Sequence, residues 1–147
     1  MVTLHTTINS KVGDLEGARD LVAELERARA LPPDMVFDLY VVLDEVISNI
    51  LKYGYADDAA HEIHVKLSAT DAAVEIGIED DGRAFDPFAV PAPDQSLPLA
   101  ERPIGGLGLH FVHNLMDDVK YARKNNRNYM VLKKLFKPPA ARVAGPA

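Results

Sequence analysis

Residues 62–82 read EIHVKLSATDAAVEIGIEDDG, and in this stretch apolar and polar side chains alternate on either side of a short break. The apolar members are Ile63, Val65, Leu67 and Ala69 before the break and Val74, Ile76 and Ile78 after it. A period of two is typical of strands that bury one face. The stretch therefore predicts paired strands at 62–69 and 73–79, joined by a tight turn at 70–72.

The segments around this hairpin predict the rest of one compact domain. Residues 2–9 alternate in the same way, whereas further segments repeat apolar residues at helical spacing. The expected elements are a strand at 2–9, helices at about 15–30, 33–54 and 105–117, and strands at 119–123 and 128–136. This order predicts an α/β (α+β) two-layer sandwich, in which three helices cover one face of a mixed, mostly antiparallel sheet of about five strands. Asp14 is the expected N-cap of the first helix.

Residues from about 83 to 104 interrupt this pattern with a long loop. The region is rich in proline and shows little periodicity. Loops of this length inside a compact domain are uncommon and are usually functional or disordered. Residues 137–147 read KPPAARVAGPA and lack core-forming side chains, so we expect a mobile tail after a folded domain at 1–136.

Composition excludes several classes of function. The chain has 147 residues, a formal net charge of -6 and no cysteine. Nucleic-acid binding needs clustered Lys and Arg, and a disulfide framework or thiolate metal site needs cysteine, so neither is expected. The N-terminus lacks the apolar segment of an export signal, and no run approaches the roughly 18 residues that span a membrane. We expect a cytoplasmic protein that binds neither nucleic acid nor membrane.

The helix at 33–54 carries a row of polar side chains opposite its apolar stripe. Glu45, Asn49 and Lys52 are spaced i, i+4 and i+7, so a carboxylate, an amide and an amine share one face. Taken alone, the row is more typical of the solvated side of an amphipathic helix than of a site.

Asp80 continues the inward face of the strand at 73–79, because it follows Ile78 by two residues. A carboxylate in that position needs a partner. One hypothesis is that backbone donors of the turn at 80–82 satisfy it. The other is that it accepts a hydrogen bond from the amino group of a ligand in a pocket.

Three glycines stand where the long loop turns into a helix, at Gly105, Gly106 and Gly108. Glycine lets backbone N–H groups approach an anion closely, and the helix N-terminus adds its positive dipole end. Arg102 precedes these glycines in the sequence, and its guanidinium group can donate two hydrogen bonds to a terminal phosphate. A glycine-rich helix start is a weak signal alone, because tight packing explains many of them.

Two pairs of side chains near these segments have a functional interpretation that we do not favour. His110 and His113 are spaced i and i+3 on the glycine-entered helix, but no obvious third ligand accompanies them, so ordinary partly buried histidines are the preferred interpretation over a zinc site. Tyr53 and Tyr55 are expected to finish the second helix rather than stack on a base, although Tyr53 is close enough to Asn49 to do so.

Taken in chain order, these features resemble the Asn box and the two glycine boxes of the GHKL ATPases, with a proline-rich lid between the glycine boxes. The matching residues are Glu45-x-x-x-Asn49, Asp80-x-Gly82 and Gly105-Gly106-Leu107-Gly108. Within that superfamily the chain resembles the stand-alone anti-sigma factor serine kinases, through DEVISNILKYGY, EDDGRAFDP and RPIGGLGLHFVHNLMDDVKYARKNNRNYMVLKKL. The resemblance spans about residues 5–136.

The resemblance implies a Bergerat-type fold with one Mg-ATP site. Asn49 would hold the Mg²⁺ that bridges the phosphates, Asp80 would read the adenine amino group, and Glu45 would be the general base. Positive charge and backbone amides would neutralise the transferred phosphoryl group. The implied nucleotide-binding set is Asn49, Lys52, Asp80, Gly82, Arg102, Gly105, Gly106, Leu107, Gly108 and Leu109.

Two positions depart from the pattern of that family. Ala84 stands where the second glycine of an Asp-x-Gly-x-Gly box is expected, and Tyr53 follows Lys52 where related kinases often carry His. Alanine narrows the backbone freedom near the adenine mouth, so we expect this departure to affect nucleotide affinity and lid mobility. Neither departure removes an assigned ligand.

The implied function is that of a protein-serine kinase acting as an anti-sigma factor. It would phosphorylate a STAS-type anti-anti-sigma protein, sequester a sigma factor in a partner switch, and form a homodimer. The alternative is a non-catalytic ATP-binding module whose nucleotide state controls partner binding. Glu45 alone separates these two hypotheses, because the other residues serve binding in both. A structural domain without a ligand is a third hypothesis, and three boxes in the right order argue against it.

Overall fold

The computed structural model describes residues 1–13, 15–84 and 106–136, with the backbone alone at 106–110. The elements are β1 (Val2–Asn9), α1 (Glu16–Ala28), α2 (Pro33–Tyr53), β2 (Glu62–Ala69), β3 (Ala73–Asp80), α3 (Gly106–Leu115), β4 (Asp118–Lys124) and β5 (Arg127–Leu135). The strand order in the sheet is β1-β2-β3-β5-β4, and every pairing in it is antiparallel.

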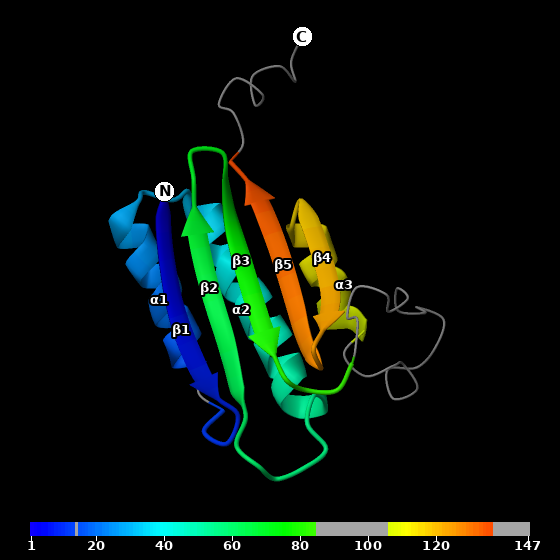
Figure 1. The fold of residues 1–147 in the computed structure, drawn as a ribbon. Helices are drawn as coiled ribbons and strands as arrows, with labels where there is room; N and C mark the ends of the chain where they lie inside the picture. The colour runs from blue at the N-terminus through cyan, green and yellow to red at the C-terminus, as the bar shows by residue number, and fades with distance from the viewer. Residues whose placement is uncertain (14, 85–105, 137–147) are drawn as a thin grey trace.

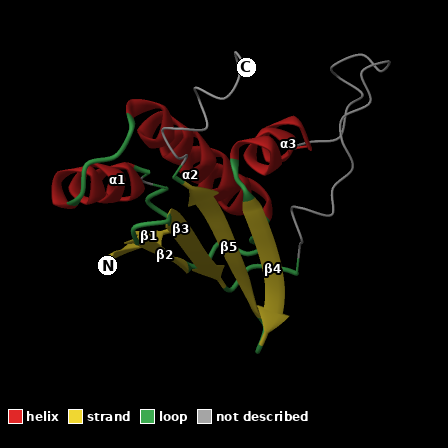
Figure 2. Cartoon of the chain, turned by 90° about the horizontal axis from the view of Figure 1, so that it is seen from above, coloured by secondary structure: helices red, strands yellow, loops and turns green. Residues whose placement is uncertain are grey.

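The sheet forms one layer and the helices form the other (Figure 1). Figure 2 shows all three helices on the same face of the sheet, and no described element covers the opposite face. The predicted two-layer sandwich is therefore confirmed. The sheet was expected to be mixed and mostly antiparallel, and the described strands are antiparallel throughout.

The observed helix bounds agree with the predicted ones to within two residues. α1 ends at Ala28 because Arg29 is already extended, with φ -151° and ψ 125°. Its first hydrogen bonds run from the N–H groups of Ala18 and Arg19 to Leu15 O, so the N-cap is Leu15. The predicted cap, Asp14, lies outside the described residues. Among the helices that the structure describes, none is long and apolar enough to cross a membrane.

One apolar core fills the space between the two layers. Leu39, Leu43 and Ile47 of α2 are fully buried, as are Leu67 of β2 and Ile76 of β3. Burying a side chain of this size contributes about 1.5–3 kcal/mol. The core therefore fixes α2 along its length against the centre of the sheet, and so determines where the ends of α2 and β3 lie.

A two-residue turn joins β4 to β5 and sets their register. Its residues, Asn125 and Asn126, have φ of 52° and 62°. Positive φ at both positions is typical of a type I′ hairpin turn, and asparagine adopts this conformation more readily than most residues. The resulting register places Asn128 of β5 between Arg123 of β4 and Asp80 of β3.

Candidate functional site

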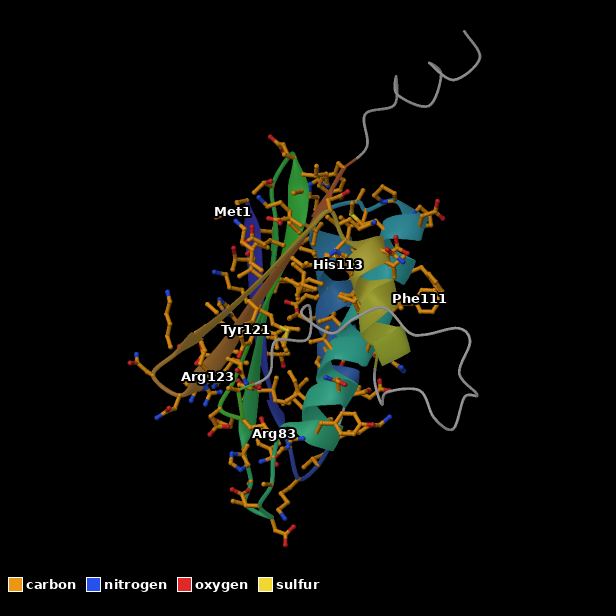
Figure 3. All side chains as sticks on the ribbon, turned by 90° about the vertical axis from the view of Figure 1, so that its right-hand side faces the viewer. Met1, Arg83, Phe111, His113, Tyr121 and Arg123 are labelled. Carbon is orange, nitrogen blue, oxygen red and sulfur yellow. The ribbon has the colours of Figure 1, made fainter. Side chains whose placement is uncertain are left out.

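The C-terminus of α2 and the end of β3 meet at one end of the molecule. Arg83, which follows β3, donates from its backbone N–H to Gly54 O at 2.9 Å and from Nε to Tyr53 O at 2.7 Å. Figures 1 and 3 show that α3 begins toward the same end. The elements that carry the polar row, the strand-end carboxylate and the glycine-rich segment therefore converge here.

Gly82 permits the close contact between the loop after β3 and the end of α2. A Cβ atom at this position would lie 2.7 Å from Gly54 O, closer than real Cβ atoms come to backbone atoms. The same carbonyl oxygen accepts the hydrogen bond from the Arg83 backbone N–H. Packing against α2 is therefore enough to require glycine at position 82.

We expect Gly82→Ala to lower the free energy of unfolding by about 1–3 kcal/mol, the usual cost of overpacking. The added methyl group would push the loop away from Gly54 O. Urea unfolding measures the loss. Gly77→Ala is the matched control, because the nearest heavy atom to its Cβ is Lys66 Cβ at an ordinary 3.8 Å. Equal losses in both variants would show that the close contact is not what requires glycine.

Asp80 lies on the inward face of β3, as its spacing predicted, and is only 2% exposed. Asn128 Nδ2 donates to its carboxylate, to Oδ1 at 2.9 Å and to Oδ2 at 3.3 Å. Burial raises the pKa of Asp80 above its ordinary value, while hydrogen bonds from Asn128 and from the Gly82 backbone act against that rise. The hypothesised turn donor is present, and a side-chain donor from β5 joins it.

Asn128 is a residue of this site that the sequence analysis did not single out. It is 4% exposed and shares the inward face of β5 with the buried residues Met130 and Leu132. An asparagine at period two with buried apolar residues was the available signal, since a buried amide needs partners. Its partner lies 48 positions away in the chain, so the signal could not name Asp80.

The predicted polar row lies on α2, with Glu45 and Lys52 exposed and Asn49 half-buried. Asp44, beside Glu45, accepts two hydrogen bonds from Arg19 of α1, at 2.6 Å from Nη2 and at 3.3 Å from Nε. This ion pair ties α1 to α2 next to the row. The partial burial of Asn49 distinguishes the row from a fully solvated helix face.

The glycine-rich segment is described in part. Gly106, Leu107, Gly108 and Leu109 form the first turn of α3, so glycine does open this helix as predicted. Other predicted residues lie outside the described part of the chain: Arg102, Gly105 and the lid from 85 to 104. His113 is exposed, and the side chain of His110 lies outside the described part of the chain.

The segment between α2 and β2 is fixed by a stacked pair of rings. α2 ends at Tyr53, and Tyr55 stacks on His61 with ring centroids 4.2 Å apart and an angle of 8° between the rings. The His61 imidazole also bridges two carboxylates, with Nε2 2.7 Å from Asp57 Oδ1 and Nδ1 3.0 Å from Asp81 Oδ1. His61 therefore links this segment to the residue that follows Asp80.

The two carboxylates make the stability of the fold depend on pH. Hydrogen bonds to Asp57 and then to Asp81 raise the pKa of His61 above its ordinary value of 6.5. Because the pKa is raised in the folded state, the contribution of His61 to the stability of the fold is fully present below about pH 6.5. It is lost as the pH rises through the folded-state pKa. We expect the native protein to have a higher free energy of unfolding than His61→Gln at pH 6, and this difference to shrink as the pH rises to 9. Urea unfolding at each pH measures the difference.

His5→Gln, which removes an exposed histidine from β1, is the matched control for this experiment. It is expected to keep the pH dependence of the native protein. A constant difference between the native protein and His61→Gln across the range would contradict the role given to the imidazole.

The chain has matches among known protein families, sequences and structures. The family model described as the histidine kinase-like ATPase domain matches residues 8–134. The chain is 29% identical over 96 residues to serine/threonine-protein kinase BtrW of Bordetella bronchiseptica, a match that covers 65% of this chain and 68% of BtrW. It is 28% identical over 104 residues to serine-protein kinase RsbW of Bacillus thuringiensis, covering 68% of this chain and 64% of RsbW.

A solved structure shows the same fold. The crystal structure of the RsbU and RsbW domains of a Mycobacterium tuberculosis protein matches with a TM-score of 0.65 and 17% identity, over 94% of this chain and 34% of that one. At this identity the likeness concerns the fold alone. Because the family model covers most of the sequence, the chain belongs to the histidine kinase-like ATPase domain family, as the resemblance of its boxes predicted.

Proposed function

We propose that the chain is an ATP-dependent protein-serine kinase that acts as an anti-sigma factor. It phosphorylates a STAS-type anti-anti-sigma protein and sequesters a sigma factor in a partner switch, as a cytoplasmic homodimer that uses Mg²⁺. The names of its relatives, at 28% and 29% identity, support the kinase class. The observation that carries the proposal is the buried Asp80 carboxylate, 2% exposed, beside the C-terminus of the helix that bears Glu45 and Asn49.

The groups around Asp80 suit an adenine base. An ionised carboxylate has about four acceptor sites, more than Asn128 and the Gly82 backbone use, so it can still accept a hydrogen bond from an amino group. Tyr55 adds a buried hydroxyl that has no partner among the described residues. Burial, and then the charges of Asp80 and Asp81, raise the pKa of this hydroxyl, so it remains a donor. Unused acceptor and donor capacity together fit a polar ligand.

The remaining proposed contacts go to the phosphates. Asn49 offers an amide oxygen, the type of ligand that Mg²⁺ prefers, and Lys52 lies on the same helix face. The start of α3, from Gly106 to Leu109, presents backbone N–H groups, and Arg102 and Gly105 are proposed to complete this phosphate site. Bound Mg-ATP supplies the transferable phosphoryl group and part of the charge neutralisation.

Glu45 is the proposed general base. Its carboxylate accepts the proton of a serine hydroxyl while the hydroxyl oxygen bonds to the γ-phosphorus and the bond from that phosphorus to the ADP oxygen breaks. Glu45 is exposed on α2, which leaves it accessible to a serine presented on the surface of another protein. The exposure therefore favours a protein substrate over a small enclosed one.

Phosphoryl transfer tests the proposal directly. The purified chain is incubated with Mg-ATP and a STAS-type protein, and mass spectrometry detects an acid-stable phosphoserine on that protein. ATP binding is followed in parallel as a rise in melting temperature. A rise without phosphoserine would replace the kinase with an ATP-binding regulatory module. If neither a rise in melting temperature nor a phosphoserine is observed, the proposal as a whole is overturned.

A further inference from the structure

Asn128 is bonded at both ends of its side-chain amide. Its Nδ2 donates to both oxygens of Asp80, at 2.9 and 3.3 Å, and to Arg83 O at 3.0 Å. Its Oδ1 accepts from Arg123 Nη1 at 3.0 Å and from the hydroxyl group of Tyr121. Figure 3 shows Tyr121, Arg123 and Arg83 in succession toward the same end of the sheet. The buried amide is therefore enclosed by partners from β3, from the loop that follows β3 and from β4.

The partners allow only one orientation of this amide. A guanidinium group has donors and no acceptor, so Arg123 must face the oxygen of Asn128 and not its nitrogen. A carboxylate that accepts hydrogen bonds must likewise face the nitrogen. Arg123 is itself fixed, because Nη1 also donates to Gly82 O at 2.6 Å. Rotating the amide by half a turn would set donor against donor at Arg123 and acceptor against acceptor at Asp80.

This fixed amide favours the ionised form of Asp80 and so acts against burial, which raises the pKa of the carboxyl group. Burial favours a protonated carboxyl group, which would act as a donor, whereas an incoming N–H bond favours the ionised carboxylate, which only accepts. The difference matters for a purine base. An amino group at the six-position needs an acceptor, and a carbonyl oxygen at the same position needs a donor.

We propose that Asn128, oriented by Arg123 and Tyr121, is a positioning residue that keeps Asp80 a hydrogen-bond acceptor only. The site thereby selects a base with an amino group over one with a carbonyl oxygen. This inference rests on the proposed function, because it assumes a purine nucleotide at Asp80. It assigns the specificity to a network of β4 and β5 and not to Asp80 alone.

Asn128→Asp tests the inference, because it replaces the N–H donor with a second carboxyl group of nearly the same shape. Two carboxyl groups this close share a proton, and the pair then presents a donor as well as an acceptor. We expect the ratio of the Mg-ITP to the Mg-ATP dissociation constant, measured by calorimetry at pH 6, to fall at least about tenfold. The ratio should recover toward pH 8 as the shared proton is lost.

Asn126→Asp is the matched control, since it adds the same charge in the β4–β5 turn, where the side chain is exposed. It is expected to leave the ratio unchanged at both pH values. Arg123→Lys is a second, milder variant that keeps the charge but loses the planar fork. It should lower the ratio by about twofold to fivefold while ATP binding persists, and so tests the network even if Asn128→Asp fails to fold.

The outcomes separate this inference from the proposed function. An unchanged ratio in a folded Asn128→Asp or Arg123→Lys variant that still binds ATP overturns the inference and leaves the ATP site standing. Equal weakening of ATP and ITP binding also overturns it, because a purely structural role would produce that result. A native protein that binds neither nucleotide overturns both.

Discussion

Replacing Glu45 with glutamine is expected to slow phosphoryl transfer to the STAS-type protein by about 10²–10⁴-fold, the usual contribution of a general base. The amide has the shape of the carboxylate but cannot take a proton from the serine hydroxyl. Glu45 is exposed on α2, so the fold should not change. Single-turnover transfer from saturating Mg-ATP measures the chemical step apart from nucleotide binding.

The control for this variant is Glu24→Gln, which removes an equally charged, exposed carboxylate from α1. We expect Glu24→Gln to transfer phosphate at the native rate, and both variants to bind ATP within about twofold of the native protein. Native-like transfer by Glu45→Gln would remove Glu45 from the proposed mechanism. A loss of ATP binding in that variant would instead give it a role in holding the nucleotide.

Asp80→Asn is expected to weaken ATP binding by about 10²–10³-fold. An asparagine at this position has one acceptor oxygen to offer. If that oxygen faces the amide nitrogen of Asn128, the side-chain NH2 group of the new asparagine faces the amino group of the base. If it is turned the other way, two buried donors meet inside the protein. Either orientation leaves one contact between two donors, and calorimetry with Mg-ATP measures the resulting loss.

Asp71→Asn provides the control, because Asp71 is exposed in the turn between β2 and β3. Its ATP affinity should equal that of the native protein, and its melting temperature shows the effect of losing one negative charge. If Asp80→Asn stays folded and its ATP dissociation constant is within about threefold of the native value, another group recognises the base.

The sequence predicted the elements of this fold because each leaves a local pattern. The alternation of Val74, Ile76 and Ile78 placed Asp80 on the inward face, and the structure confirms that position at 2% exposure. The helical spacing of Leu39, Leu43 and Ile47 likewise predicted the buried stripe of α2. These patterns reflect one chain segment meeting one buried surface, and no knowledge of distant residues is needed to detect them.

What the sequence could not predict depends on pairing between distant segments. Asn128 reaches Asp80 through the register of β3 with β5, and Gly82 meets Gly54 through the packing of a loop on a helix end. His61 is a further case, since its second carboxylate partner, Asp81, lies 20 positions away in the sequence. Contacts of this kind follow from the assembled core and leave no periodic trace in the chain.

The turn at Asn125 and Asn126 contributes to the proposed base selection through its length. Side chains alternate between the two faces of a sheet, and the buried Met130 and Leu132 hold β5 in register on β3, so one more or one fewer residue in this turn would move the inward side chains of β4 to the open face. Arg123 would then leave Asn128, although every residue of the network was still present in the chain. Substitutions that keep positive φ at both positions are compatible with the site, whereas insertions and deletions are not. The proposed preference for an amino-bearing base thus depends partly on the number of residues in the turn between β4 and β5.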